Sequence, residues 1–109
     1  MDKNFYITTP IYYPSAKPHM GHAYSSIIAD FLARFKRMDG YNVHFLTGTD
    51  EHGLKIQRAA EDNNIEPLKF CDKISQTFRD LSKTLNLSNT DFIRTTEERH
   101  KKTVQHLWS

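Results

Sequence analysis

Two short polar segments carry the residues whose types and spacing could do chemistry. The first, PHMGH, has His19 and His22 three positions apart with Gly21 between them. Imidazoles at a helix start add hydrogen-bond donors to backbone N–H groups that already attract anions. Gly21 would let a phosphorylated ligand approach the backbone, because glycine has no Cβ. The segment predicts a phosphate site, with an ordinary helix start as the alternative.

The second segment, GTDEHG, places Asp50 and Glu51 directly after an apolar run. A carboxylate at the carboxyl end of a strand can hold a substrate ammonium group or a ribose hydroxyl. Either carboxylate is therefore a candidate for binding a substrate. The alternative is a solvated acidic turn in which Gly48 and Gly53 supply backbone freedom.

Metal binding is a rival interpretation of the same two segments. His19, His22, Asp50 and His52 offer enough nitrogen and oxygen ligands for zinc or iron, which would suit a metal-dependent hydrolase using His19, His22 and Asp50. Metal ligands, however, usually cluster at i, i+4 spacing on one segment, whereas these residues lie on two. We therefore expect no resident metal.

The elements that must position these segments follow from the hydrophobic pattern. Strands are predicted from short β-branched and aromatic runs at residues 5–9, 42–47 and 91–94. A loop with two prolines is expected over residues 11–18, and helices are predicted at residues 19–38, 54–64, 67–85 and 98–108. Alternating strands and helices are typical of an α/β fold with a parallel sheet. Ligands bind such sheets at the carboxyl ends of the strands, where both polar segments fall.

Several side chains are predicted to serve the fold. Apolar residues three or four apart on the first helix are expected to pack together: Met20, Ala23, Tyr24, Ile27, Ile28, Phe31, Leu32, Phe35 and Met38. A second stripe, Phe70, Ile74, Phe78, Leu81 and Leu85, is expected to pack on the third helix, with Cys71 buried beside it. Thr95 and Glu98 have the spacing of a capping box, and Arg94, Arg99, Lys101 and Lys102 are expected to form a solvated basic face.

Length, charge and cysteine content limit the classes of protein to which the chain can belong. The chain has 109 residues and a formal net charge of +2, which suits one folding unit and gives no reason to expect a dedicated nucleic-acid-binding module. The single cysteine allows neither an internal disulfide nor a cysteine-based zinc knuckle. We see no signal sequence and no apolar run near the ~18 residues that span a membrane, so we expect a cytoplasmic protein without a membrane partner.

The two segments and their surroundings resemble a known family. PHMGH is similar to the HIGH signature of class I aminoacyl-tRNA synthetases, with Met20 at the position of the usual isoleucine or leucine. Four longer strings resemble bacterial-type methionyl-tRNA synthetases, over essentially the whole chain: FYITTPIYYPSAKPHMGHAY, ADFLARFKRMDGYNV, FLTGTDEHG and DFIRTTEERHKK. The resemblance implies half of a Rossmann-like (HUP-type) nucleotide-binding domain over residues 1–109.

The resemblance also implies roles for single residues. His19, Gly21 and His22 match positions that bind ATP, and the two histidines would hold charge that develops on its phosphates while methionine is adenylated. Asp50 matches the residue that binds the amino group of methionine. Pro10, Ile11 and Tyr13 match positions that line the methionine pocket.

Other parts of the family are missing from these 109 residues. We find no KMSKS loop, no connective insertion with its zinc knuckle and no anticodon-binding helical domain. We therefore expect a portion of a methionine–tRNA ligase that uses ATP with Mg²⁺ and is inactive alone, tRNA(Met) being a partner of the complete enzyme only. A complementing C-terminal portion or self-association is expected. A truncated, non-catalytic ATP-binding module is the alternative.

Overall fold

Three parallel strands form the sheet of this protein. The computed structural model describes residues 3–13 and 18–109. The strands β1 (Asn4–Thr8), β2 (Asn42–Thr49) and β3 (Asp91–Arg94) lie in the order β1-β2-β3. Both pairings are parallel, which confirms the predicted α/β class. Within the loop predicted for residues 11–18, positions 14–17 lie outside the described residues.

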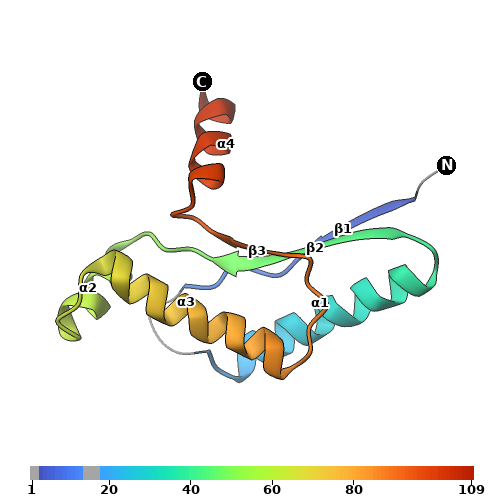
Figure 1. Ribbon diagram of the computed structural model, residues 1–109, viewed down its shortest axis with the longest axis horizontal. Coiled ribbons are helices and arrows are strands. Elements are labelled where there is room, and N and C mark those ends of the chain that lie inside the picture. Colours follow the sequence, from blue (N-terminus) through green and yellow to red (C-terminus); the bar gives the residue numbers. More distant parts are fainter. Residues whose placement is uncertain (1–2, 14–17) are drawn as a thin grey trace.

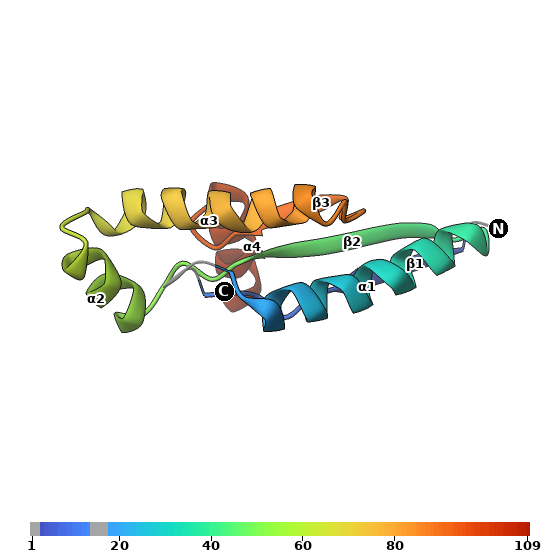
Figure 2. The same ribbon diagram turned by 90° about the horizontal axis from the view of Figure 1, so that it is seen from below.

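Four helices connect and flank the strands. They are α1 (Met20–Met38), α2 (Leu54–Asp62), α3 (Pro67–Thr84) and α4 (Glu98–Trp108), close to the predicted ranges. Figures 1 and 2 show α1 and α3 on the same face of the sheet, on either side of β2, while α4 projects away from the opposite face. None of the helices in the described part of the chain is long and apolar enough to cross a membrane.

Two apolar clusters hold α1 and α3 to the sheet. The first joins α1 to β1 and β2 and is built on Ala29, Ala33, Val43 and Phe45. The second joins α2 and α3 to the ends of the strands and contains Tyr12, Ile56, Ala60, Phe70, Cys71, Ile74 and Phe78. The apolar stripe predicted on α3 and the burial of Cys71 are thus confirmed, because these side chains are buried or half-buried.

The packing predicted for α1 is wrong. Its buried residues are Ser26, Ala29, Asp30 and Ala33, whereas the large apolar side chains are exposed, as in Met20 at 84% and Phe31 at 68%. Small side chains let the helix backbone approach the sheet closely, so the larger ones lie outside that contact. The protein therefore carries an unpartnered apolar face on α1, next to the open edge of β1.

The expected break at Gly48 is also wrong, because β2 continues through this residue to Thr49. A Cβ at Gly48 would lie 2.0 Å from the carbonyl oxygen of Ile93 on the neighbouring strand. Glycine thus permits close strand pairing here instead of a turn. Gly53, with φ +113°, does supply the backbone freedom expected of it.

Candidate active site

Tyr12 joins the two polar segments at the carboxyl ends of β1 and β2. Its backbone N–H donates to the Gly48 carbonyl at 3.1 Å, and its carbonyl accepts the Asp50 N–H at 2.7 Å. These hydrogen bonds tie the loop after β1 to the loop after β2. Both polar segments thus follow strands at the same edge of the sheet, as predicted.

The buried side chain of Tyr12 also reaches the start of α1. Its hydroxyl is 2.8 Å from Ser26 Oγ and donates to the His22 carbonyl at 3.2 Å. Its ring stacks on Phe78 of α3 and meets the His22 ring edge-on, with centroids 5.5 and 4.7 Å apart. Tyr12 thus belongs to the apolar core and is only 7% exposed.

The first turn of α1 is capped by the two histidines themselves. His19 Nδ1 accepts the Gly21 N–H at 3.0 Å, and His22 Nδ1 accepts the His19 N–H at 3.0 Å. With Nδ1 engaged as the acceptor, each neutral ring carries its proton on Nε2. The two rings lie 3.9 Å apart by their centroids, so two donors of one kind sit together at a helix N-terminus. This reciprocal cap lacks the usual serine or threonine, and the sequence pattern alone did not reveal it.

Burial lowers the pKa of His22 below its usual value, and the neighbouring His19 lowers it further. The neutral ring of His22 is therefore favoured at neutral pH. Such a ring donates a hydrogen bond from Nε2 without a full positive charge.

Gly21 has a structural reason to be glycine. A Cβ at this position would lie 2.9 Å from Cε1 of His19. The missing side chain thus makes room for the His19 ring against the first turn. The close approach of a ligand, predicted from the sequence, stays a prediction.

In the second segment, the side chains of Asp50 and Glu51 differ clearly in exposure and in hydrogen-bond partners. Asp50 is partly exposed, and its Oδ1 accepts the His52 N–H at 3.3 Å and the Thr95 hydroxyl at 3.4 Å. The side chain of Glu51 has 0% exposure and accepts hydrogen bonds from Thr49 and Thr96 at 2.8 and 2.5 Å. The suggestion that Glu51 could bind substrate is therefore wrong, and Asp50 is the available carboxylate.

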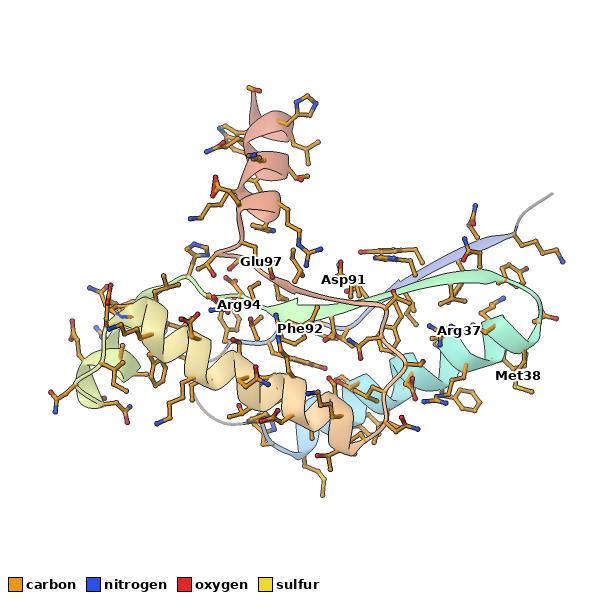
Figure 3. All side chains as sticks on the ribbon, in the orientation of Figure 1. Arg37, Met38, Asp91, Phe92, Arg94 and Glu97 are labelled. Carbon is orange, nitrogen blue, oxygen red and sulfur yellow. The ribbon has the colours of Figure 1, made fainter. Side chains whose placement is uncertain are left out.

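Arg94 neutralises the buried Glu51. Its Nε and Nη2 donate to the two carboxylate oxygens at 2.6 and 2.9 Å, and Nη2 also reaches Asp72 of α3 at 2.6 Å. Figure 3 shows Arg94 at the end of β3, facing α3. The hydrogen bonds that Arg94 donates to Glu51 raise the pKa of the guanidinium further. The solvated basic face predicted to include Arg94 is therefore wrong at this residue.

Cys71 and Thr95 both lie beside this ion pair. Burial raises the pKa of the Cys71 thiol to about 11, and the charge of Glu51 adds to the shift, which suits an inert, buried thiol. The capping box predicted for Thr95 and Glu98 is wrong, because the N-cap residue of α4 is Glu97 and the Thr95 hydroxyl accepts the Glu51 N–H at 2.8 Å. Thr95 is a site residue that the sequence pattern assigned elsewhere.

Pro10, Ile11 and Tyr13 are exposed and border different hollows of the described surface. Pro10 lies beside Tyr24 of α1, and Ile11 beside Leu46 and Ile93 on the open face of the sheet. Tyr13 lines a cavity of about 470 Å³ with His52, Gly53, Leu54 and Lys55. The described residues alone thus do not bring the three positions into one pocket.

The metal interpretation gains nothing from the geometry. Within residues 3–13 and 18–109, no three histidine, cysteine or acidic side chains are grouped so that they could hold a metal ion. His19 and His22 instead use one nitrogen each to cap α1.

Comparison with known proteins shows where this arrangement recurs. Residues 5–109 match the model of a family described as tRNA synthetases class I (M). The chain is 58% identical over 108 residues to the mitochondrial methionine–tRNA ligase of Takifugu rubripes, covering 99% of this chain and 18% of that protein. Identity to the methionine–tRNA ligase of Rickettsia bellii is also 58%, over 99% of this chain and 21% of that protein.

Solved structures agree. The Mycobacterium tuberculosis methionyl-tRNA synthetase bound by methionyl-adenylate superposes with a TM-score of 0.95 and 47% identity, over 97% of this chain and 21% of that one. The described fold therefore matches the corresponding part of the catalytic domain of that methionyl-tRNA synthetase. The chain spans only about a fifth of the length of these relatives.

Proposed function

The chain belongs to the class I (M) family of tRNA synthetases, and from this premise we propose that it supplies the N-terminal part of the catalytic domain of a methionine–tRNA ligase. The complete enzyme would join methionine to ATP as methionyl-adenylate and then transfer it to tRNA(Met). One observation carries the proposal: Tyr12 ties a pair of imidazole donors at a helix N-terminus to a loop with one available carboxylate.

His19 and His22 would bind the phosphates of ATP, which reaches the site as its Mg²⁺ complex. In the proposed step, the carboxylate of methionine attacks the α-phosphorus, a P–O bond forms, and the bond to the leaving pyrophosphate breaks. Charge moves onto the phosphoryl oxygens, where fixed Nε2–H donors and the N-terminus of α1 stabilise it. The histidines transfer no proton in this account.

Asp50 would hold the other end of methionine. Its carboxylate complements an ammonium group, and its side chain is 27% exposed. Pro10, Ile11 and Tyr13 would border the methionine pocket once further parts of the domain close it, which fits their exposure here.

The exposed apolar residues of α1 indicate that further protein packs here. Tyr24, Phe31 and Phe35 are 54–68% exposed along one helix, beside the unpaired edge of β1. Exposed apolar faces and open strand edges both favour association. We infer a complementing portion of the same enzyme at this face, with self-association of the chain as the outcome when that portion is absent.

The experiment is methionine-dependent exchange of pyrophosphate into ATP by a full-length ligase that carries this chain. His19→Ala and His22→Ala should each lower kcat about 10²-fold or more, as expected for loss of a transition-state donor. Asp50→Asn should mainly raise the KM for methionine. Wild-type enzyme without exchange, or histidine variants with full kcat, would refute the proposal.

Experiments on the 109-residue chain alone test the role of His19 and the dependence of activity on further parts of the enzyme. We expect weak ATP binding in calorimetry that His19→Ala abolishes, and no exchange activity. Equal ATP affinity in both proteins would contradict the role of His19, and robust exchange by the chain alone would contradict its dependence on further parts.

A further inference from the structure

The hydroxyl of Thr95 lies where three groups of the β2 loop converge. Thr95 directly follows β3 and is only 6% exposed. Its Oγ1 is 2.8 Å from the Glu51 backbone nitrogen, 2.9 Å from His52 Nδ1 and 3.4 Å from Asp50 Oδ1. A single buried hydroxyl therefore contacts three consecutive residues of the loop.

The hydrogen-bonding capacity of this hydroxyl matches its surroundings. A threonine hydroxyl has one proton and two lone pairs. The Glu51 N–H can only donate, so it takes one lone pair, and Nδ1–H of His52 can take the second. The hydroxyl proton is then directed to Asp50 Oδ1, which can only accept while Asp50 is ionised.

This arrangement leaves one oxygen of Asp50 for a ligand. Oδ1 accepts the Thr95 hydroxyl and the His52 N–H, whereas Oδ2 has no hydrogen-bond partner among the described residues. The carboxylate is thus oriented through Oδ1 while Oδ2 stays available. A fixed carboxylate binds an ammonium group better than a freely rotating one, because less rotamer freedom is lost on binding.

Thr95 is itself held firmly. Its N–H donates to the Thr49 carbonyl at 3.2 Å, which extends the pairing of β3 with β2. On one side Arg94 binds the buried Glu51 carboxylate, and on the other Thr96 donates to it. The backbone that carries the hydroxyl therefore cannot shift without disturbing a buried ion pair.

We propose that Thr95 is a positioning residue that orients the Asp50 carboxylate for the amino group of the substrate. The proposal rests on the proposed function, in which Asp50 binds methionine. It makes Thr95 responsible for recognising the amino group and not for the phosphate chemistry at His19 and His22.

The test compares two ligands in the full-length ligase: methionine and its analogue that lacks the amino group. Thr95→Val keeps the shape and removes the hydroxyl. It should weaken methionine binding about ten-fold, the effect of one hydrogen bond to a charged group, and change the affinity for the analogue less than about two-fold. Thr95→Ser restores the hydroxyl and should restore binding. The KM for ATP should stay unchanged in both variants.

Thr90→Val is the matched control. The Thr90 hydroxyl likewise accepts a backbone N–H, that of Phe45 in β2 at 2.9 Å, but it lies at the other end of β3. The Thr90→Val variant should change the affinities for methionine and for the analogue by the same factor. Equal weakening of both ligands by Thr95→Val, or no weakening of either, would overturn the proposal.

Two further outcomes are decisive. If Thr95→Val does not fold, Thr95→Ala allows the same comparison, and failure of both to fold would assign Thr95 a structural role and overturn the proposal. If the wild-type enzyme binds neither ligand, the proposed function itself fails, a result distinct from failure of Thr95 alone.

Discussion

The two loops of the site are held by different kinds of contact. The loop after β2 is fixed by partners far away in the chain, chiefly Arg94 at the end of β3 and Thr95 directly after it, through a buried ion pair and a buried hydroxyl. The histidine segment is fixed within its own first turn, by the reciprocal hydrogen bonds of His19 and His22. The end assigned to the amino group is therefore built into the sheet, and the end assigned to phosphate is a local property of α1.

The largest effect should come from breaking the long-range anchor. Arg94→Ala leaves the Glu51 carboxylate buried and without its cation, so the free energy of unfolding should fall by about 3–5 kcal/mol in chemical denaturation. Arg99→Ala is the matched control, because Arg99 pairs with Asp91 and Glu97 at the surface and is 50% exposed. Similar losses from both substitutions would show that the buried pair is not the anchor.

Adding a methyl group beside each loop, at Gly48 of β2 and at Gly21 of α1, should give the next largest difference between the two regions. Gly48→Ala would place Cβ against the backbone of β3, so we expect it to destabilise the fold by about 1–3 kcal/mol. Gly21→Ala would press only on the His19 ring and improve helix propensity, so stability should change by less than about 1 kcal/mol. Pyrophosphate exchange by the full-length Gly21→Ala enzyme should nevertheless fall, since His19 must shift. Comparable destabilisation by both variants would contradict this difference.

Sequence reasoning succeeded where local rules decide. The strand and helix positions follow from β-branched and aromatic runs and from apolar periodicity, and the carboxyl-end rule placed both segments correctly. It failed where a partner about 40 residues away decides, because neither the burial of Glu51 by Arg94 nor the use of Thr95 leaves a local pattern. The exposed face of α1 was missed for a related reason: periodicity shows which residues share a face and not what covers it.

The smallest expected effect is on the protonation of the histidine segment. Burial and His19 lower the pKa of His22, so the unfolded chain takes up a proton more readily than the native one. The contribution of His22 to stability should be present above its unfolded pKa of about 6.5 and lost as the pH falls below that value. An NMR titration of the His22 ring should give a midpoint below 6.5 in the folded protein. A midpoint at or above this value would contradict the packing of His22 against Tyr12 and Phe78.

The central claim is that these two loops form opposite ends of one site for methionyl-adenylate. It is tested most directly by a crystal structure of the full-length ligase with methionyl-adenylate bound. We expect Nε2 of His19 or His22 within hydrogen-bonding distance, about 3 Å, of a phosphate oxygen, and Asp50 Oδ2 at a similar distance from the amino group. An adenylate whose phosphate lies away from both histidines, or whose amino group is bound elsewhere, would contradict the account.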